Sequence, residues 1–131
     1  MMFSHCGLFC LTGLNAFLGE FMKLITAIIR HEKIEDVKEA LTRIKVTGMT
    51  VREVRGHGRQ KGHKAVYHGA EYSLTLLPKA MLETVVSDEI ADQVVTAIID
   101  TARTGEIGDG RVFVYPVEHS YNVRTGESDV T

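Results

Sequence analysis

The sequence is poor in cysteine, proline and aromatic residues, has no tryptophan, and carries no strong excess of either charge. Its two cysteines, Cys6 and Cys10, cannot build a disulfide framework, so we expect a reducing, cytoplasmic setting. A structural zinc site needs about four ligands, and this pair with His5 supplies too few. A formal net charge of −2 also argues against binding to nucleic acid through overall charge.

Residues 1–21 contain no lysine or arginine and are interrupted by glycines. They lack the basic start of a secretory signal and the unbroken apolar run of a membrane-spanning helix. We therefore predict an N-terminal extension without function at 1–21, upstream of a true start at Met22, and one domain at 22–131. The alternative is a tail that binds a membrane or a partner.

Two common nucleotide-binding motifs are also missing. The chain has no Gly-x-x-x-x-Gly-Lys-Ser/Thr loop, and no Gly-x-Gly-x-x-Gly segment follows a predicted strand and opens a helix. This disfavours standard NTPase chemistry and dinucleotide binding. No nucleophile with a neighbouring base stands out, so we predict that the chain is not an enzyme, while a slow ATPase activity is left open.

The first half of the chain reads as strand, helix, strand. Lys23–Arg30 is rich in isoleucine and predicts a strand. Apolar residues then recur at three- and four-residue steps from Ile34 to Ile44, which is typical of an amphipathic helix. Gly48 ends this pattern, and the alternating residues of Thr50–Arg55 predict a half-buried strand.

The second half repeats this order. Leu82–Val86 predicts a strand, and Ser87 is a suitable N-cap for a helix with an apolar stripe over 90–102. Arg111–Val117 predicts the last strand, in which Pro116 favours an edge position.

The order predicts an α+β protein, a ferredoxin-like βαβ-βαβ sandwich with a long loop between strands 2 and 3. Two helices cover only one face of a four-stranded sheet, so we expect the other face to self-associate. The polar tail after Arg124 is predicted to be loose.

The long loop, Gly56–Tyr72, is basic, rich in glycine and without apolar periodicity, and such inserts are usually functional. We expect no regular structure in it. Its three histidines, His57, His63 and His68, have no rigid spacing and are interpreted as solvated side chains rather than metal ligands. The basic loop leaves open an alternative function as an RNA-binding ferredoxin-like module, although aromatic residues make up only 7% of the chain.

A second glycine-rich segment, Thr104–Val114, lies between the second helix and the last strand. Its three glycines allow backbone N–H groups to face an anion, and Arg111 adds a guanidinium suited to phosphate. The alternative is a plain helix-to-strand turn. Together with the glycines of the long loop, the segment predicts a site for a phosphorylated ligand.

Three segments now described, GMTVREVRGHGRQKGH, YHGAEY and TGEIGDGRVFV, resemble those of the PII nitrogen-regulatory signal-transduction proteins. The resemblance runs from Met22 to about Glu127. It implies a cytoplasmic homotrimer that binds ATP or ADP in clefts between subunits, with Mg²⁺ and ATP supporting the binding of 2-oxoglutarate.

The resemblance also implies how such a regulator acts. The long loop, about 55–75, docks on targets such as an ammonium transporter or a nitrogen-control enzyme. Contact with a membrane would come only through the transporter, and no nucleic acid is bound directly. Tyr72 is the implied site of uridylylation by a uridylyltransferase.

The resemblance implies the following binding residues by position. The ATP or ADP site comprises Ile28, Thr50, Gly56, Gly58, Arg59, Gln60, Val85, Gly108, Asp109, Gly110, Arg111 and Arg124. The 2-oxoglutarate site comprises Gln60, Lys61, Gly62 and Lys79, and Gln60 also completes the Mg²⁺ shell.

One departure from the family pattern lies near the C-terminus. The family commonly has two arginines one residue apart, whereas this chain has Asn122 and Arg124. Loss of one charged hydrogen bond to phosphate is expected to weaken nucleotide binding by about 1–3 kcal/mol and to blur the discrimination of ATP from ADP.

Overall fold

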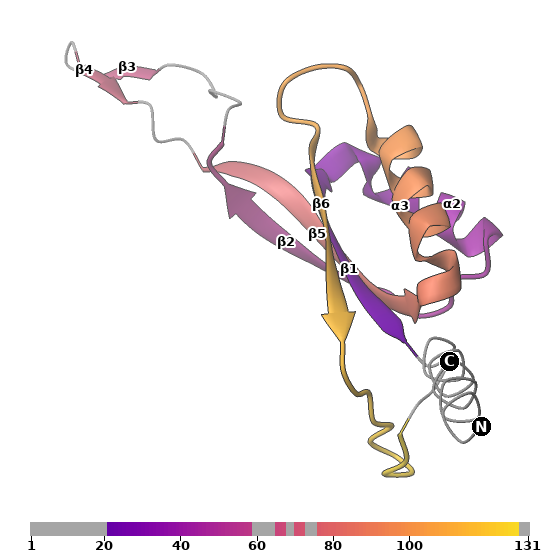
Figure 1. Cartoon of the computed structure of the whole chain (residues 1–131). Helices are drawn as coiled ribbons and strands as arrows, with labels where there is room; N and C mark the ends of the chain where they lie inside the picture. Colours follow the sequence, from indigo (N-terminus) through magenta and orange to yellow (C-terminus); the bar gives the residue numbers. More distant parts are fainter. Residues whose placement is uncertain (1–20, 59–64, 68–69, 73–75, 129–131) are drawn as a thin grey trace, which may run out of the picture.

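The computed structural model describes residues 21–58, 65–67, 70–72 and 76–128. Its elements in chain order are β1 (Met22–Arg30), η1 (His31–Lys33), α2 (Ile34–Arg43), β2 (Thr50–Gly56), β3 (Ala65–Tyr67), β4 (Ala70–Tyr72), β5 (Leu77–Ser87), α3 (Asp88–Ala102) and β6 (Gly110–Val117). Four strands form one antiparallel sheet in the order β2-β5-β1-β6, and both α-helices lie on one face of it (Figure 1). This arrangement confirms the predicted ferredoxin-like α+β fold.

The core lies between the sheet and the two helices. In β1 the side chains of Ile25, Ala27 and Ile29 are buried against the helices, while Leu24 and Ile28 point to the opposite face and are partly exposed. This alternation follows from the two-residue period of a strand. The fully buried members of the core come from β1, β5 and both helices, namely Ile25, Ile29, Val37, Leu41, Leu82, Val94 and Ile98.

The predicted helices are confirmed, but one predicted cap is not. Ser87 occupies the N-cap position of α3, yet its hydroxyl makes no capping hydrogen bond. The amide of Asp88 donates instead to the carbonyl oxygen of Phe21, at 3.0 Å. Ser87 is also the last residue of β5, so the chain segment that enters β1 lies close enough to satisfy the start of α3.

One predicted strand boundary requires correction. β5 begins at Leu77 rather than Leu82, because it pairs with β2 along its whole first half, from Thr50↔Glu83 to Gly56↔Leu77. β1 ends opposite Lys79. Pro78 therefore lies where β5 has only one neighbouring strand, and its missing N–H is tolerated there. The predicted edge position of Pro116 is confirmed, since β6 is an outer strand.

The long loop contains regular structure, which corrects the prediction that it has none. β3 and β4 pair as a short antiparallel hairpin in which Tyr67 is opposite Ala70. The hairpin projects beyond the ends of β2 and β5, away from the sheet (Figure 1).

The expectation of a loose tail is also wrong for the described residues. Tyr121 forms an antiparallel bridge with Ser128, and a tight turn closes between them. Within the part of the chain that the structure describes, no helix has the length and apolar character needed to cross a bilayer.

Candidate functional site

A cleft of about 550 Å³ opens on the helix-free face of the sheet, at the edge where β2 ends and β5 and β6 begin. The antiparallel register brings these strands together, because Ile28 of β1 is opposite both Met81 of β5 and Arg111 of β6. Arg30 of β1 is likewise opposite Lys79 of β5. The cleft is lined by Ile28, Gly56, His57, Gly58, Leu77, Lys79, Glu106, Ile107, Gly108, Asp109, Gly110, Arg111 and Phe113.

The carboxylate of Asp109 organises the loop between α3 and β6. One oxygen accepts hydrogen bonds from the amides of Thr104, at 2.8 Å, and Gly105, at 2.9 Å. The other accepts from the Thr104 hydroxyl and from Nε of Arg30, which lies 3.1 Å away. Arg30 also donates to the carbonyl oxygen of Ile107, at 3.0 Å. The loop is thus tied both to itself and to the end of β1.

These contacts favour the ionised carboxylate. The hydrogen bond from the Thr104 hydroxyl, with those from the two amides and Arg30, holds the pKa of Asp109 well below its ordinary value of 3.8. Partial desolvation acts in the opposite direction and is outweighed. Asp109 is therefore ionised near neutral pH, and its carboxylate oxygens act as acceptors for the loop.

The lowered pKa predicts a pH-dependent stability. A carboxyl group with a depressed folded pKa contributes stability that is present above its unfolded pKa and is lost as pH falls through the folded value. We expect the free energy of unfolding of the wild type to exceed that of Asp109→Asn by a constant amount between about pH 5 and 7, and the difference to shrink below about pH 4. Urea unfolding across this range measures it. A difference that grows on acidification would contradict the assignment.

Lys79, which the family resemblance places in the 2-oxoglutarate site, lies near the start of β5. Its Nζ donates to the carbonyl oxygen of Gly108, at 2.6 Å. Desolvation, followed by the nearby charge of Arg30, lowers the pKa of Lys79, while Glu32 and Asp109 act in the opposite direction. Lys79 lines the cleft, and a second cation, Arg30, is opposite it on the neighbouring strand β1.

Gly110 allows the loop to pack directly on β1. Its φ of +117° is unfavourable for other residues, and an added Cβ would lie 1.9 Å from the carbonyl oxygen of Ile28. Arg111 follows at once and is exposed. Among the described residues, no hydrogen bond or ion pair occupies its guanidinium, which leaves it available to an anion.

The structure places seven of the predicted nucleotide residues in this cleft, together with Lys79 of the predicted 2-oxoglutarate site. The seven are Ile28, Gly56, Gly58, Gly108, Asp109, Gly110 and Arg111. Asp109 was predicted as a nucleotide ligand, and in the structure its side chain organises the loop. Arg30 and Thr104 were missed, because no local pattern links Arg30 to a residue 79 positions away.

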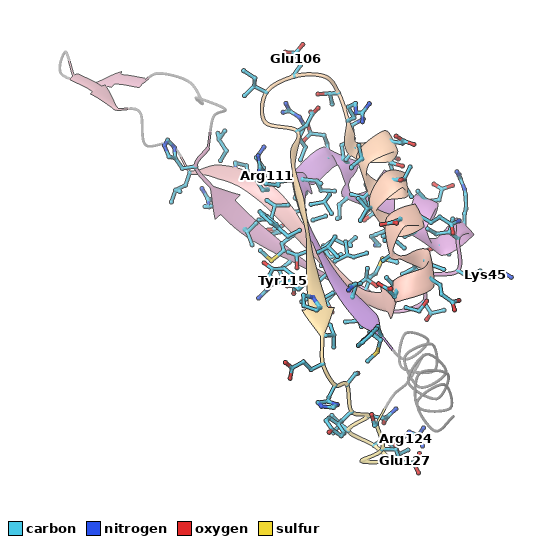
Figure 2. The ribbon with its side chains drawn as sticks, in the orientation of Figure 1. Lys45, Glu106, Arg111, Tyr115, Arg124 and Glu127 are labelled. Atoms are coloured by element: carbon cyan, nitrogen blue, oxygen red, sulfur yellow. The ribbon has the colours of Figure 1, made fainter. Side chains whose placement is uncertain are left out.

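Three other predicted residues lie elsewhere. Thr50 is six residues before Gly56 in β2, and Val85 is six residues after Lys79 in β5, and neither lines the cleft. Arg124 belongs to the turn beyond β6, and Figure 2 shows it in the lower part of the molecule, well away from Arg111 at the start of β6. One subunit alone therefore does not bring all predicted ligands together.

The remaining predictions fall outside the described residues. These are Arg59, Gln60, Lys61 and Gly62, and also the extension at 1–20. Tyr72 is described only as a backbone position at the end of β4. Of the histidines in the long loop, His57 lines the cleft, while His63 and His68 lie outside the described residues. No three potential metal ligands cluster in the part of the chain that is described.

The fold and the cleft define a class of protein, a ferredoxin-like domain with a cleft lined by two glycine-rich segments where β2 ends and β5 and β6 begin. The family model described as "Nitrogen regulatory protein P-II" matches residues 22–127. The chain therefore belongs to the nitrogen regulatory protein P-II family, whose members named below are regulatory proteins.

Known members are similar over most of their length. The nitrogen regulatory protein P-II of Haemophilus influenzae is 56% identical over 108 residues, which cover 82% of this chain and 96% of that protein. Nitrogen regulatory protein P-II 1 of Escherichia coli K12 is 55% identical with the same coverage. The P-II protein of Rhizobium etli is 50% identical over 108 residues.

Proposed function

We propose that this protein is a PII-type signal transducer that binds ATP or ADP together with 2-oxoglutarate and reports their levels to target proteins. The observation that carries the proposal is the cleft, in which a loop organised by Asp109 places Gly108, Gly110 and Arg111 beside Gly58 of the long loop. Backbone amides in a glycine-rich loop and a guanidinium that no described residue engages are suited to a polyphosphate.

The nucleotide site is completed by a second copy of the chain. Thr50, Val85 and Arg124 do not line their own cleft, and Arg124 lies well away from it in the turn beyond β6. They lie on or beside the helix-free face, which exposes Val85 (46%), Phe113 (39%) and Tyr115 (48%). Burying this apolar surface against a neighbour favours assembly, here as a homotrimer, and carries these residues to the neighbour's cleft.

The effector 2-oxoglutarate is assigned to the end of the cleft that holds Lys79 and Arg30. A dicarboxylate is recognised by closely spaced cations, and these two side chains are neighbours across β1 and β5. Gln60 is proposed to complete the shell of a Mg²⁺ ion bound with ATP, and Lys61 and Gly62 to hold the other end of the effector. Lys79 must then exchange the carbonyl of Gly108 for a carboxylate.

This exchange gives a prediction for Lys79. We expect Lys79→Gln to weaken 2-oxoglutarate binding in the presence of Mg²⁺ and ATP by roughly 10–150-fold, the value of a charged hydrogen bond of about 1.5–3 kcal/mol. ATP affinity should stay close to that of the wild type, because Asp109 still holds the loop. Isothermal titration measures both. The matched control is Lys38→Gln on the exposed side of α2, which should change neither affinity.

The long loop is proposed to transmit ligand binding to target proteins, because its first residues form part of the cleft. Gly56, His57 and Gly58 line it directly. A ligand that contacts them biases the conformation of the segment that carries Tyr72, the proposed uridylylation site of a uridylyltransferase. The proposed targets are an ammonium transporter or a nitrogen-control enzyme, and the proposed location is the cytoplasm, with membrane contact only through the transporter.

One set of measurements tests the proposal as a whole. Light scattering is expected to give the mass of three chains, and titration calorimetry to show saturable binding of ATP and of ADP. Binding of 2-oxoglutarate should require Mg²⁺ and ATP, and ATP turnover is followed in the same samples. A monomer that ignores adenine nucleotides at millimolar concentration would overturn the proposal.

A further inference from the structure

The turn that carries Arg124 is built around Asn122. The Asn122 amide donates to the carbonyl oxygen of Glu127, at 2.8 Å, and its carbonyl oxygen accepts from the amide of Gly126, at 2.7 Å. These two bonds, with the bridge between Tyr121 and Ser128, close a short hairpin after β6. Backbone hydrogen bonds therefore hold the turn in one conformation.

The side chain of Asn122 adds two further bonds, and both reach the residues that follow. Its Oδ1 accepts from the amide of Arg124, at 2.9 Å, and from the amide of Thr125, at 3.3 Å. Asparagine and aspartate form such turns because their short side chains place an acceptor beside the amides two and three positions on. An arginine at the same position has no acceptor and could not form them.

The remaining guanidinium is thus attached to a backbone that is held in place before any ligand arrives. Arg124 is exposed, and no described residue forms an ion pair with it. A charged group on a fixed backbone loses less conformational freedom on binding than one on a loose tail, so more of its interaction energy appears as affinity.

We propose that Asn122 is a positioning residue whose carboxamide oxygen orients Arg124 for the phosphates of a nucleotide bound by the neighbouring subunit. The inference rests on the proposed function, because it needs Arg124 to meet a nucleotide. At position 122 one guanidinium is thus replaced by an acceptor that holds the backbone carrying the other.

The first test observes the turn without nucleotide. Amide hydrogen exchange is compared in the wild type, Asn122→Ala, Asn122→Ser and Val123→Ala. The serine variant keeps a weaker acceptor, and Val123 is fully exposed in the same turn, so its truncation is the matched control. We expect exchange at Arg124 and Thr125 to accelerate in Asn122→Ala, less in Asn122→Ser, and not in Val123→Ala. Unchanged exchange in Asn122→Ala would overturn the inference.

The second test measures ATP affinity in the same variants and in an Arg124→Ala background. If the two bonds to Asn122 Oδ1 contribute as much to ATP binding as about one hydrogen bond, the Kd of Asn122→Ala for ATP should be roughly 3–10-fold weaker than that of the wild type. Asn122→Ser should recover part of this affinity. The alanine effect should vanish when Arg124 is already alanine, since the two residues act as a pair. A merely structural effect would persist in that background.

The two possible failures are distinguishable. If the wild type binds ATP and Asn122→Ala binds it equally well despite faster exchange, the positioning role is wrong while the proposed function stands. If the wild type binds neither ATP nor ADP, the proposed function fails, and the positioning role fails with it.

Discussion

Gly110→Ala is expected to lose roughly 2–6 kcal/mol of unfolding free energy, the combined cost of a positive-φ alanine and of an overpacked contact. The new methyl group would lie 1.9 Å from the carbonyl oxygen of Ile28 and 3.0 Å from the Cα of Ile29. Both atoms belong to the backbone of β1, which is fully paired and cannot give way. The loop would have to lift off β1, and the cleft would lose its wall.

Two other glycines supply matched controls for this prediction. Gly105 also has a positive φ, +90°, but no atom lies within 4 Å of the position that an alanine methyl group would take, so Gly105→Ala tests backbone strain alone, at about 1–3 kcal/mol. Gly48 has neither strain nor a close contact, and Gly48→Ala should be neutral or slightly stabilising. Urea unfolding at fixed protein concentration ranks the three. Equal losses at Gly110 and Gly105 would show that the contact with β1 is unimportant.

Arg111→Ala is expected to weaken ATP binding by roughly 10–150-fold, which corresponds to a charge-assisted hydrogen bond of about 1.5–3 kcal/mol. The guanidinium stands at the mouth of the cleft with no protein partner among the described residues, so its removal leaves no buried group unpaired. We therefore expect the free energy of unfolding to change little. The ATP affinity of Arg111→Lys should fall between those of the wild type and Arg111→Ala, because lysine keeps the charge and loses the planar pair of donors.

Arg103→Ala is the matched control for charge. Arg103 lies just after α3 and does not line the cleft, although the hollow that it lines between α3 and β6 shares Asp109, Gly110 and Arg111 with the cleft. Its loss changes the net charge by the same amount without touching the cleft, so ATP affinity should be unchanged. Calorimetry at two salt concentrations completes the test, since a direct contact in the cleft is less screened than a surface field. Equal effects of the two variants would show that only overall charge matters.

The local elements were predictable because their signals are local. The two-residue alternation of β1 and the apolar stripes of α2 and α3 predict which side chains face the core. The burial of Ile25, Val37 and Val94 confirms this prediction. The family was also predictable, since TGEIGDGRVFV is a contiguous segment. For the same reason, the loop containing Gly108, Gly110 and Arg111 was assigned before its position in the fold was known.

The contacts that shape the site were not predictable in this way. Asp109 meets Arg30 across 79 residues, and Lys79 meets Gly108 across 29. The acceptor role of Asn122 was missed for a different reason, because the position was read as a lost arginine and not as a turn-forming residue.

The amino-acid sequence alone determined β1, β2, β6 and both α-helices, and which loops carry glycine and positive charge, because backbone propensity and side-chain periodicity act over a few residues. The tertiary structure decided where β5 begins, which carboxylate organises the cleft, and which predicted ligands a single subunit cannot bring together. These outcomes depend on antiparallel register and on packing between distant segments. The pairing of distant segments depends on the total free energy of the fold, so it cannot be predicted from any short segment of the chain.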